Sequence, residues 1–251
     1  MALEIYQFGY NQDNYGVLLH DSDSGATAMV DAGDAGAARG ALTATGWTLT
    51  QIWITHHHGD HTAGLSDIAT ETGAATYGPP GVPGIENALA EGDSFVFAGR
   101  QVDVLATPGH TLDMLNFHLV SEKLAFTGDT LFAMGCGRLF EGDAEMMWAS
   151  LTKLMALADD TIIYCSHEYT VANAAFALSV DPDNQALQRR AEAVAELRAA
   201  GHPTVPTIMA LEKETNPFLR AGEPAIRARL GMDAAADSAV FAEIRRRKDN
   251  F

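Results

Sequence analysis

Short apolar and β-branched runs alternate with turns through the first two-thirds of the chain, a pattern that predicts β-strands. The five clearest predicted strands cover residues 28–31, 51–55, 101–105, 123–127 and 161–165. Four of them end within a few residues on a histidine or an aspartate. Loops after strands are common sites of chemistry, because a rigid sheet fixes the loops that leave it. We therefore look for functional residues at these strand ends.

Apolar residues spaced three and four apart predict helices in the rest of the chain. Asp143 is expected to cap the first of them. A longer amphipathic helix is expected over 184–200. Its expected inward residues are Leu187, Ala191, Val194 and Leu197. Pro224 suits the first turn of a helix that ends near Gly231, and Ser238 is expected to cap the last helix.

This change of pattern divides the chain into a β-rich domain at 1–168 and a helical domain at 169–251. A length of 251 residues suffices for one large domain or one domain with a small appendage. The composition, 47% hydrophobic and 20% charged, is ordinary for a globular protein. We therefore expect an α/β domain followed by a smaller α-helical domain.

Net charge limits the classes of partner. A charge of −17 argues against nucleic acid, because neutralising phosphates requires Lys and Arg. The first residues lack the basic start and apolar stretch of a secretory signal, and no run is long enough to span a membrane. Cys136 and Cys165 are too few for a disulfide framework and are expected to be reduced thiols. We expect a cytoplasmic monomer without a membrane or nucleic-acid partner.

Four basic residues stand together at 245–248 in a chain that has only 16 Lys and Arg. One interpretation is a binding site for a small anion. The other is a solvated basic end of a helix, which the helix dipole favours. Charge alone leaves both open.

Histidines and an aspartate crowd the loop after the second predicted strand: His56, His58, Asp60 and His61. In an extended loop, side chains at 56 and 58 point the same way and the side chain at 57 points the opposite way. We therefore expect His57 not to be a ligand. Closely packed imidazoles repel if protonated and are poorly solvated if buried. A bound zinc, iron or manganese ion removes both problems, whereas a solvated polar loop does not explain the crowding.

Other strand ends supply further ligands at His110, Asp129 and His167. Seven ligands suit two ions better than one. The expected sets are His56, His58 and His110 for one ion and Asp60, His61 and His167 for the other. Asp129 can bridge, because a carboxylate has two oxygens. Two ions roughly 3.5–4 Å apart leave room for a bridging water or hydroxide.

Several segments resemble the metallo-β-lactamase superfamily. The segment Thr55–His61 matches its T-H-x-H-x-D-H signature, and Asp31, 107–111, 127–130 and 166–167 match its other motifs in the usual order. The resemblance implies an α/β fold, a four-layer αββα metallo-β-lactamase sandwich with a small C-terminal α-helical domain. It implies the same ligand sets. It also implies that Asp31 orients the metal loop without binding metal.

Narrower motifs resemble one family in this superfamily, glyoxalase II (hydroxyacylglutathione hydrolase). The matching segments are 135–142, the H-E-Y-T motif at 167–170, the N-P-F-x-R motif at 216–220 and the tail 244–251. The resemblance implies hydrolysis of S-D-lactoylglutathione and related 2-hydroxyacylglutathiones to D-lactate and glutathione by a metal-bridging hydroxide. This reaction is the second step of methylglyoxal detoxification. Two divalent ions are expected, zinc first, with iron or manganese fitting the same donors.

The same resemblance implies catalytic roles for Asp60 and Asp129 and a glutathione site in the helical domain. The implied substrate contacts are Arg138, Leu139, Phe140, Tyr169, Arg245 and Lys248. Phe140 stands where the family commonly has tyrosine, and Arg138 stands where many members have lysine, which changes hydrogen-bond geometry. The sequence after His110-Thr111 also departs from the frequent S-G-H.

Other functions remain as alternatives. A glutathione-linked persulfide dioxygenase of the same superfamily would use a single iron and part of the ligand set. The acidic balance argues against a nucleic-acid phosphodiesterase. A non-catalytic metal protein would not need the expected substrate contacts. The full ligand set and the basic tail favour the hydrolase.

Overall fold

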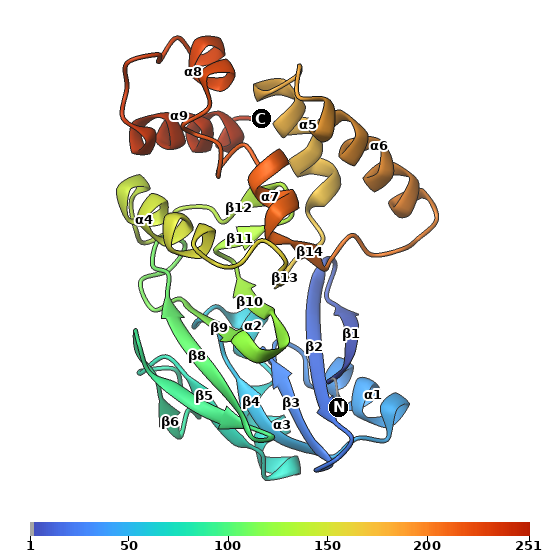
Figure 1. Ribbon diagram of the computed structural model, residues 1–251. Helices are drawn as coiled ribbons and strands as arrows, with labels where there is room; N and C mark the ends of the chain where they lie inside the picture. The colour runs from blue at the N-terminus through green and yellow to red at the C-terminus, as the bar shows by residue number, and fades with distance from the viewer. Residues whose placement is uncertain (1–2) are drawn as a thin grey trace. The chain divides into compact units, whose positions relative to one another are not determined.

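The computed structural model describes residues 3–251, which form two compact units. The first unit runs to Ala106 and includes Asp113–Gly128. The second comprises Thr107–Leu112 and Asp129–Phe251. The first unit holds the strands drawn in blue to green in Figure 1, and the second holds most of the helices.

The first unit contains a mixed sheet in which consecutive strands are neighbours. Its strands are β1 (Glu4–Tyr10), β2 (Asn14–Asp21), β3 (Ala26–Val30), β4 (Leu49–Trp53), β5 (Ala75–Gly78) and β6 (Asn87–Ala88). The first three strands pair antiparallel, and β3 to β6 pair parallel. Parallel strands end at the same edge of a sheet, so the loops that follow β3 and β4 lie beside each other.

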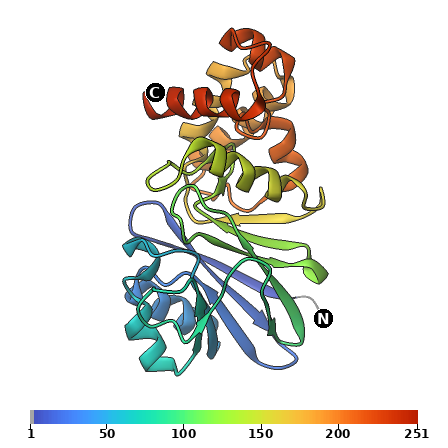
Figure 2. The same cartoon turned by 90° about the vertical axis from the view of Figure 1, so that its left-hand side faces the viewer.

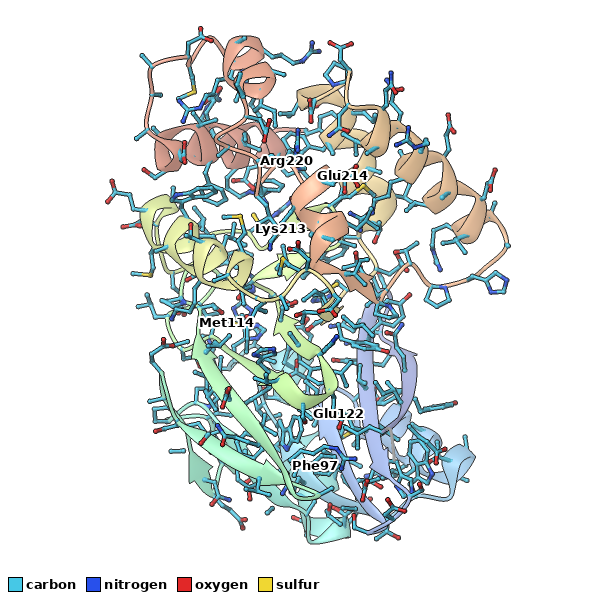
Figure 3. All side chains as sticks on the ribbon, viewed as in Figure 1. Phe97, Met114, Glu122, Lys213, Glu214 and Arg220 are labelled. Carbon is cyan, nitrogen blue, oxygen red and sulfur yellow. The ribbon has the colours of Figure 1, made fainter. Side chains whose placement is uncertain are left out.

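A second group of strands in this unit is antiparallel. It consists of β7 (Ser94–Phe97), β8 (Arg100–Ala106), β9 (Leu115–Leu119) and β10 (Leu124–Gly128), with a 3₁₀ turn at Val120–Glu122. The fully buried ring of Trp53 on β4 joins the two groups. Its ring centroid lies 5.2–6.2 Å from the rings of Phe95, Phe97, Phe117 and Phe126. Figure 3 labels Phe97 within this layer of side chains.

Helices cover the other face of the mixed sheet, as Figure 2 shows. They are α1 (Ala35–Thr45) and α3 (Leu65–Thr72), and the short α2 (Gly59–Thr62) precedes α3. Alanines of α1 and apolar residues of α3 pack with Leu18, Met29 and Ile52 of the sheet. Asp34 begins α1 by accepting a hydrogen bond from the Ala37 amide at 2.7 Å.

The second unit is mainly helical. Its helices are α4 (Ala144–Met155), α5 (Thr170–Val180), α6 (Gln185–Ala199), α7 (Met209–Thr215), α8 (Pro224–Leu230) and α9 (Asp237–Asp249). Its strands are the pair β11 (Leu131–Phe132) and β12 (Gly135–Cys136) and the pair β13 (Ile162–Cys165) and β14 (Thr207–Ile208). The ring of Phe218 packs against Phe176 and Phe241, which joins α5 and α9 around one aromatic core.

Most predicted elements are present. All five predicted strands occur, with ends displaced by no more than two residues. Asp143 caps α4 by accepting from the Met146 amide at 2.8 Å, and Asn184 caps α6 by accepting from the Leu187 amide at 3.1 Å. Pro224 begins α8, and Gly231 ends it in the left-handed conformation. These helix ends were predictable because the capping residue lies within three positions of the amide it satisfies.

Two details of the helices were predicted wrongly. Ser238 does not cap the last helix, because Ala236 holds the capping position and α9 begins at Asp237, so that Ser238 lies inside the first turn. Leu197 is not inward, since its side chain is 41% exposed on the last turns of α6. A buried arginine, Arg190, shares the inward face of α6 with Leu187 instead.

Candidate metal centre

In the first unit, the loop after β4 gathers the expected ligands His56, His58, Asp60 and His61. His56 and His61 are fully buried, with ring centroids 4.1 Å apart. Asp31, which directly follows β3, lies beneath this loop and is itself buried. Its backbone is left-handed (φ 57°), a conformation that non-glycine residues adopt only when their surroundings hold them there.

Asp31 orients the ring of His61. Its carboxylate Oδ2 accepts a hydrogen bond from His61 Nδ1 at 2.8 Å. A ring nitrogen that donates to a carboxylate carries the proton, so the neutral ring keeps its lone pair on Nε2. That nitrogen lies 3.4 Å from Asp60 Oδ2. The arrangement leaves His61 ready to bind a cation through Nε2.

Thr55 extends this control to His56. The amide and the hydroxyl of Thr55 both donate to Asp31, at 2.8 and 3.0 Å. The hydroxyl has only one proton to give, so it accepts from His56 Nδ1 at 3.0 Å. The lone pair of His56 is then on Nε2, which lies 3.0 Å from His58 Nδ1. One buried carboxylate therefore orients two expected ligands.

Asp60 is held by β1 and by the start of β2. Asn14 donates to its Oδ2 at 2.9 Å, and the hydroxyl of Tyr10 donates to its backbone carbonyl at 2.9 Å. Gly33 permits the close approach of this loop, because a Cβ there would lie 1.7 Å from the Asp60 carbonyl oxygen. These contacts keep the partly exposed carboxylate beside His61.

His57 lies at the surface beside this cluster, with its ring centroid 5.0 Å from that of His58. Its side chain is 43% exposed, and its Nδ1 lies 3.0 Å from Asp113 Oδ1. The ring is thus directed to the surface while the rings of its neighbours His56 and His61 are buried.

The second unit brings together the other three expected ligands. His110, Asp129 and His167 are each about 5% exposed or less. His110 Nδ1 donates to the carbonyl oxygen of Arg138 at 2.9 Å, which leaves the lone pair on Nε2. Asp129 Oδ2 lies 3.4 Å from His110 Nε2 and 3.3 Å from His167 Nε2. Gly137 allows this packing, since a Cβ there would lie 2.0 Å from the Asp129 carbonyl oxygen.

The spacing of donors within each unit fits a divalent cation. Two ligand atoms about 2.1 Å from a tetrahedral ion lie about 3.4 Å from each other. The three nitrogen–oxygen pairs described, one in the first unit and two in the second, are 3.3–3.4 Å apart. In the pairs of His61 and His110, the ring nitrogen and the carboxylate oxygen both present lone pairs, and a cation between them removes their repulsion. The donor sets of the chain fit a divalent metal site.

Aromatic side chains adjoin the ligands of the second unit. The ring of Tyr169 stacks on His167 at 4.7 Å between centroids, and Phe140 meets His110 edge to face at 5.2 Å. Phe140 is 63% exposed and Tyr169 is 38% exposed. Both rings are accessible to a bound molecule. Leu139 is half-buried and Arg138 is exposed beside them in sequence.

The basic tail is divided by burial. Arg246 and Arg247 are exposed and pair with Glu243, as a solvated helix end would. Arg245 is 4% exposed and donates to the Cys136 carbonyl and to Asp249. Lys248 is half-buried and donates to the Ala172 carbonyl at 2.9 Å. Arg246 and Arg247 thus match the solvated helix end, whereas a role of Arg245 and Lys248 in anion binding stays a prediction.

Electrostatics indicate that Lys248 lies in an electropositive site. Burial, together with the nearby positive charges of Arg245 and Arg138, lowers the pKa of Lys248 to about 8. An ammonium group that loses its proton this readily is stabilised by an anion placed beside it. The three cations thus form a group suited to a carboxylate.

Both cysteines are free thiols buried in the second unit, as the sequence predicted. Burial raises the pKa of the Cys136 thiol to about 11 and that of Cys165 to about 12. Thiols of this kind stay protonated at neutral pH, and only thiolates are good nucleophiles. Neither cysteine is suited to nucleophilic catalysis.

Sequence reasoning missed several residues that hold the ligands. Tyr10 and Asn14 contact Asp60 across 50 and 46 positions, and the Arg138 carbonyl contacts His110 across 28. No local spacing signals such contacts. Thr55 was visible as part of a motif, but its link between Asp31 and His56 required the structure.

Family models cover nearly the whole chain. The model of the metallo-β-lactamase superfamily matches residues 12–84 and 79–167. The model described as hydroxyacylglutathione hydrolase C-terminus matches residues 168–251.

Curated relatives match over their full length. A protein of Rhizobium meliloti (strain 1021) named hydroxyacylglutathione hydrolase is 56% identical over 254 residues, covering 100% of this chain and 99% of that protein. One of the same name from Maricaulis maris (strain MCS10) is 53% identical over 253 residues, with 99% of each covered.

Among solved structures, ETHE1 from Myxococcus xanthus matches with a TM-score of 0.67 and 24% identity, covering 99% of this chain and 98% of that one. This similarity confirms the expected α/β metallo-β-lactamase fold. With the two family models and the relatives at more than half identity, it shows that the chain belongs to the hydroxyacylglutathione hydrolase family of the metallo-β-lactamase superfamily.

Proposed function

We propose that this protein hydrolyses the thioester S-D-lactoylglutathione, and related 2-hydroxyacylglutathiones, to D-lactate and glutathione. The relatives named hydroxyacylglutathione hydrolase support this reaction. The observation that carries it is one feature of the second unit. That unit presents metal-type donors at His110, Asp129 and His167 together with the cationic group around Lys248. A glutathione thioester needs both, because its carbonyl must be polarised and its carboxylates must be bound.

The seven expected ligands are proposed to hold two ions. His56, His58 and His110 would bind one ion, Asp60, His61 and His167 would bind the other, and Asp129 would bridge them. Imidazole and carboxylate donors suit zinc first and accept iron or manganese. Support comes from the ring orientations that Asp31, Thr55 and the Arg138 carbonyl impose.

A divalent cation, when bound, lowers the pKa of a coordinated water towards neutrality and polarises a carbonyl. Asp60 and Asp129 are proposed to accept hydrogen bonds from the attacking water and to orient it towards the thioester carbon. Asp31 keeps its hydrogen bond to His61 throughout, so the ring does not turn. The leaving thiolate has a solution pKa near about 8.5, so it departs without a dedicated general acid.

Substrate positioning is proposed to fall to the aromatic and basic residues of the second unit. Tyr169 and Phe140 would flank the acyl end, with Arg138 and Leu139 beside them. Lys248 would contact a glutathione carboxylate, because its half-buried ammonium gains from a neighbouring anion. Arg245 would add to the positive field there, although two of its nitrogens already donate to the protein.

We also propose domain boundaries, a cellular location and an oligomeric state. The metal-binding domain covers 1–168 and the glutathione-binding domain covers 169–251. The protein works as a cytoplasmic monomer without a nucleic-acid partner. Within residues 3–251, no helix combines the length and the apolar character that crossing a membrane requires.

A thioester assay tests the proposal directly. Purified protein with its native metal is given S-D-lactoylglutathione, and the loss of thioester and release of thiol are followed together with metal analysis. We expect the loss of thioester and the release of thiol to proceed in parallel, without consumption of oxygen. Consumption of dioxygen with a glutathione persulfide, and no thioester cleavage, would instead support the single-iron dioxygenase.

Asp129→Ala tests the bridging role. Because both proposed ions lose a ligand, we expect bound metal and turnover to fall together, measured by elemental analysis and steady-state kinetics on one preparation. His57→Ala is the control, since His57 is exposed and lies outside the proposed ligand sets. Retention of wild-type metal content and near-normal turnover in Asp129→Ala would show that the bridging assignment is wrong.

A further inference from the structure

A short hairpin links two parts of the proposed metal centre in the second unit. It consists of β11 and β12 and begins two residues after Asp129. It ends two residues before Arg138, whose carbonyl oxygen orients His110. Any displacement of the hairpin would therefore move a ligand at one end and the hydrogen-bond acceptor of a second ligand at the other.

Side chains from the C-terminal helices hold the backbone of this hairpin. The side-chain amide of Asn216 donates to the backbone carbonyls of Phe132 and Gly135 at 3.2 and 3.0 Å. Three further bonds are Asn173 to the Ala133 carbonyl at 3.1 Å, Arg245 to the Cys136 carbonyl at 2.9 Å, and the Met134 amide to Glu212 at 2.9 Å. Every residue from 132 to 136 thus has a backbone group bound by a side chain. We call Asn173, Glu212, Asn216 and Arg245 the clasp.

The clasp is anchored by a buried ion pair. Glu212 is fully buried and pairs with Arg190 of α6, which also donates to the hydroxyls of Thr207 and Thr215. Asn216 Nδ2 contacts the second carboxylate oxygen of Glu212 at 3.0 Å. An unpaired carboxylate at such a position would be strongly destabilising, so the network holds its members in one arrangement.

The hairpin needs this support. Met134, at its turn, has left-handed backbone (φ 54°) although it is not glycine. Such a conformation costs free energy and persists only where neighbouring contacts impose it. Asn173 also packs so closely that a Cβ on Gly135 would lie 2.3 Å from its Nδ2. The conformation of the turn is therefore set from outside the hairpin.

We propose that Asn216, Asn173 and Glu212 are positioning residues of the metal centre, which act by fixing the hairpin that connects Asp129 to Arg138, the acceptor of His110. The proposal rests on the proposed function, because it takes Asp129 and His110 as ligands. It gives the C-terminal helices a second role beyond substrate binding. The N-P-F-x-R motif contributes through its asparagine, which ties α7 to the hairpin.

Metal affinity provides the test, because a merely structural asparagine would not change it. Asn216→Ala removes both carbonyl contacts, and Asn173→Ala removes one. We expect metal affinity, measured by chelator competition on the loaded protein, to fall roughly 10- to 100-fold in Asn216→Ala and less in Asn173→Ala. Turnover should fall with it while KM changes little, since Lys248 is untouched.

Asn184→Ala is the matched control. This substitution also removes side-chain amide hydrogen bonds within the second unit, namely those to the Leu187 amide, Asp181 and the Glu214 carbonyl. None of these bonds involves the hairpin. Thermal unfolding of all three variants shows whether their losses of stability are comparable. Equal losses of metal affinity in Asn184→Ala and Asn216→Ala would overturn the proposal, as would unchanged affinity in Asn216→Ala.

Two further comparisons keep the result interpretable. If Asn216→Ala does not fold, Asn173→Ala decides, because it leaves the Arg190–Glu212 pair intact and must still weaken metal binding relative to Asn184→Ala. Asp129→Ala separates this proposal from the function itself. If Asp129→Ala loses metal and neither clasp variant does, only the positioning role of the clasp is overturned. If Asp129→Ala loses no metal, the ligand assignment itself is overturned.

Discussion

Lys248 shows how one side chain combines structural and chemical constraints. Its aliphatic stem is half-buried, and its ammonium lies 5.3 Å from the ring centroid of Phe176 and 5.5 Å from that of Phe251. These rings attract a cation weakly, whereas burial and two arginines oppose it. Such a site is unfavourable for the free protein and becomes favourable when an anion binds.

Removing this charge should affect substrate binding more than chemistry. Lys248→Ala deletes a contact remote from the thioester, felt about equally in the ground state and the transition state, so KM should rise while kcat changes less. A charge-assisted contact worth about 1.5–3 kcal/mol predicts a loss of roughly 10- to 150-fold in kcat/KM. Steady-state kinetics with S-D-lactoylglutathione measure this.

Arg246→Ala is the matched control for that change. Arg246 lies on the same helix but is exposed, and it pairs with Glu243. It should alter kcat/KM little. A thioester without glutathione carboxylates should be equally insensitive to both substitutions. Equal losses with the two substrates, or none with either, would exclude Lys248 from the glutathione site.

The pH dependence of KM follows from the same residue. Below pH 8 the Lys248 ammonium is charged and can bind a carboxylate, and above its pKa of about 8 the charge is lost in the free enzyme. KM should therefore rise as the pH increases beyond about 8. Lys248→Arg keeps its charge at all accessible pH and should flatten this rise. A KM profile that is identical in the two proteins between pH 7 and 9.5 would disprove the assignment.

At the scale of elements, the ends of two helices in the second unit make a clear contrast. Asn184 accepts from the Leu187 amide at the start of α6, whereas no side chain caps α9. Asn184→Ala should lower the free energy of unfolding by about 1–2 kcal/mol. Ser238→Ala should change it by less than about 0.5 kcal/mol. Chemical denaturation of both variants measures the difference. An equal loss of unfolding free energy in Ser238→Ala would show that Ser238 is a helix cap after all.

Whole-molecule stability should depend on metal. Ligands that bind only the folded chain stabilise it, by about 2.7 kcal/mol per site at one hundred times the dissociation constant. Chelation should therefore lower the unfolding temperature by roughly 5–10 °C for each occupied site in a protein of this size. Calorimetry with and without a chelator measures this. In Asp129→Ala the chelator should lower the unfolding temperature less. An unfolding temperature that does not change on chelation of the wild type would contradict metal binding by the folded chain.

Much of the candidate site could be read from the sequence because its signals are local. The histidines of the loop after β4 lie within six positions, and each remaining expected ligand follows a strand that apolar periodicity reveals. The substitution of phenylalanine at 140 and the basic residues at 245–248 were equally visible. The helix cap at Asp143 was predictable for the same reason, since a cap satisfies an amide three positions away.

Only the tertiary structure decided which of these residues face inward and what holds them. Arg245 is buried and Lys248 half-buried while Arg246 and Arg247 remain exposed, although all four read alike in the sequence. Arg190 occupies a core position because Glu212, 22 positions away, compensates its charge. The clasp joins Asn216 to a hairpin 81–84 positions earlier. Local pattern determines elements and donor types, but burial and long-range hydrogen bonds depend on which surfaces meet when the chain folds.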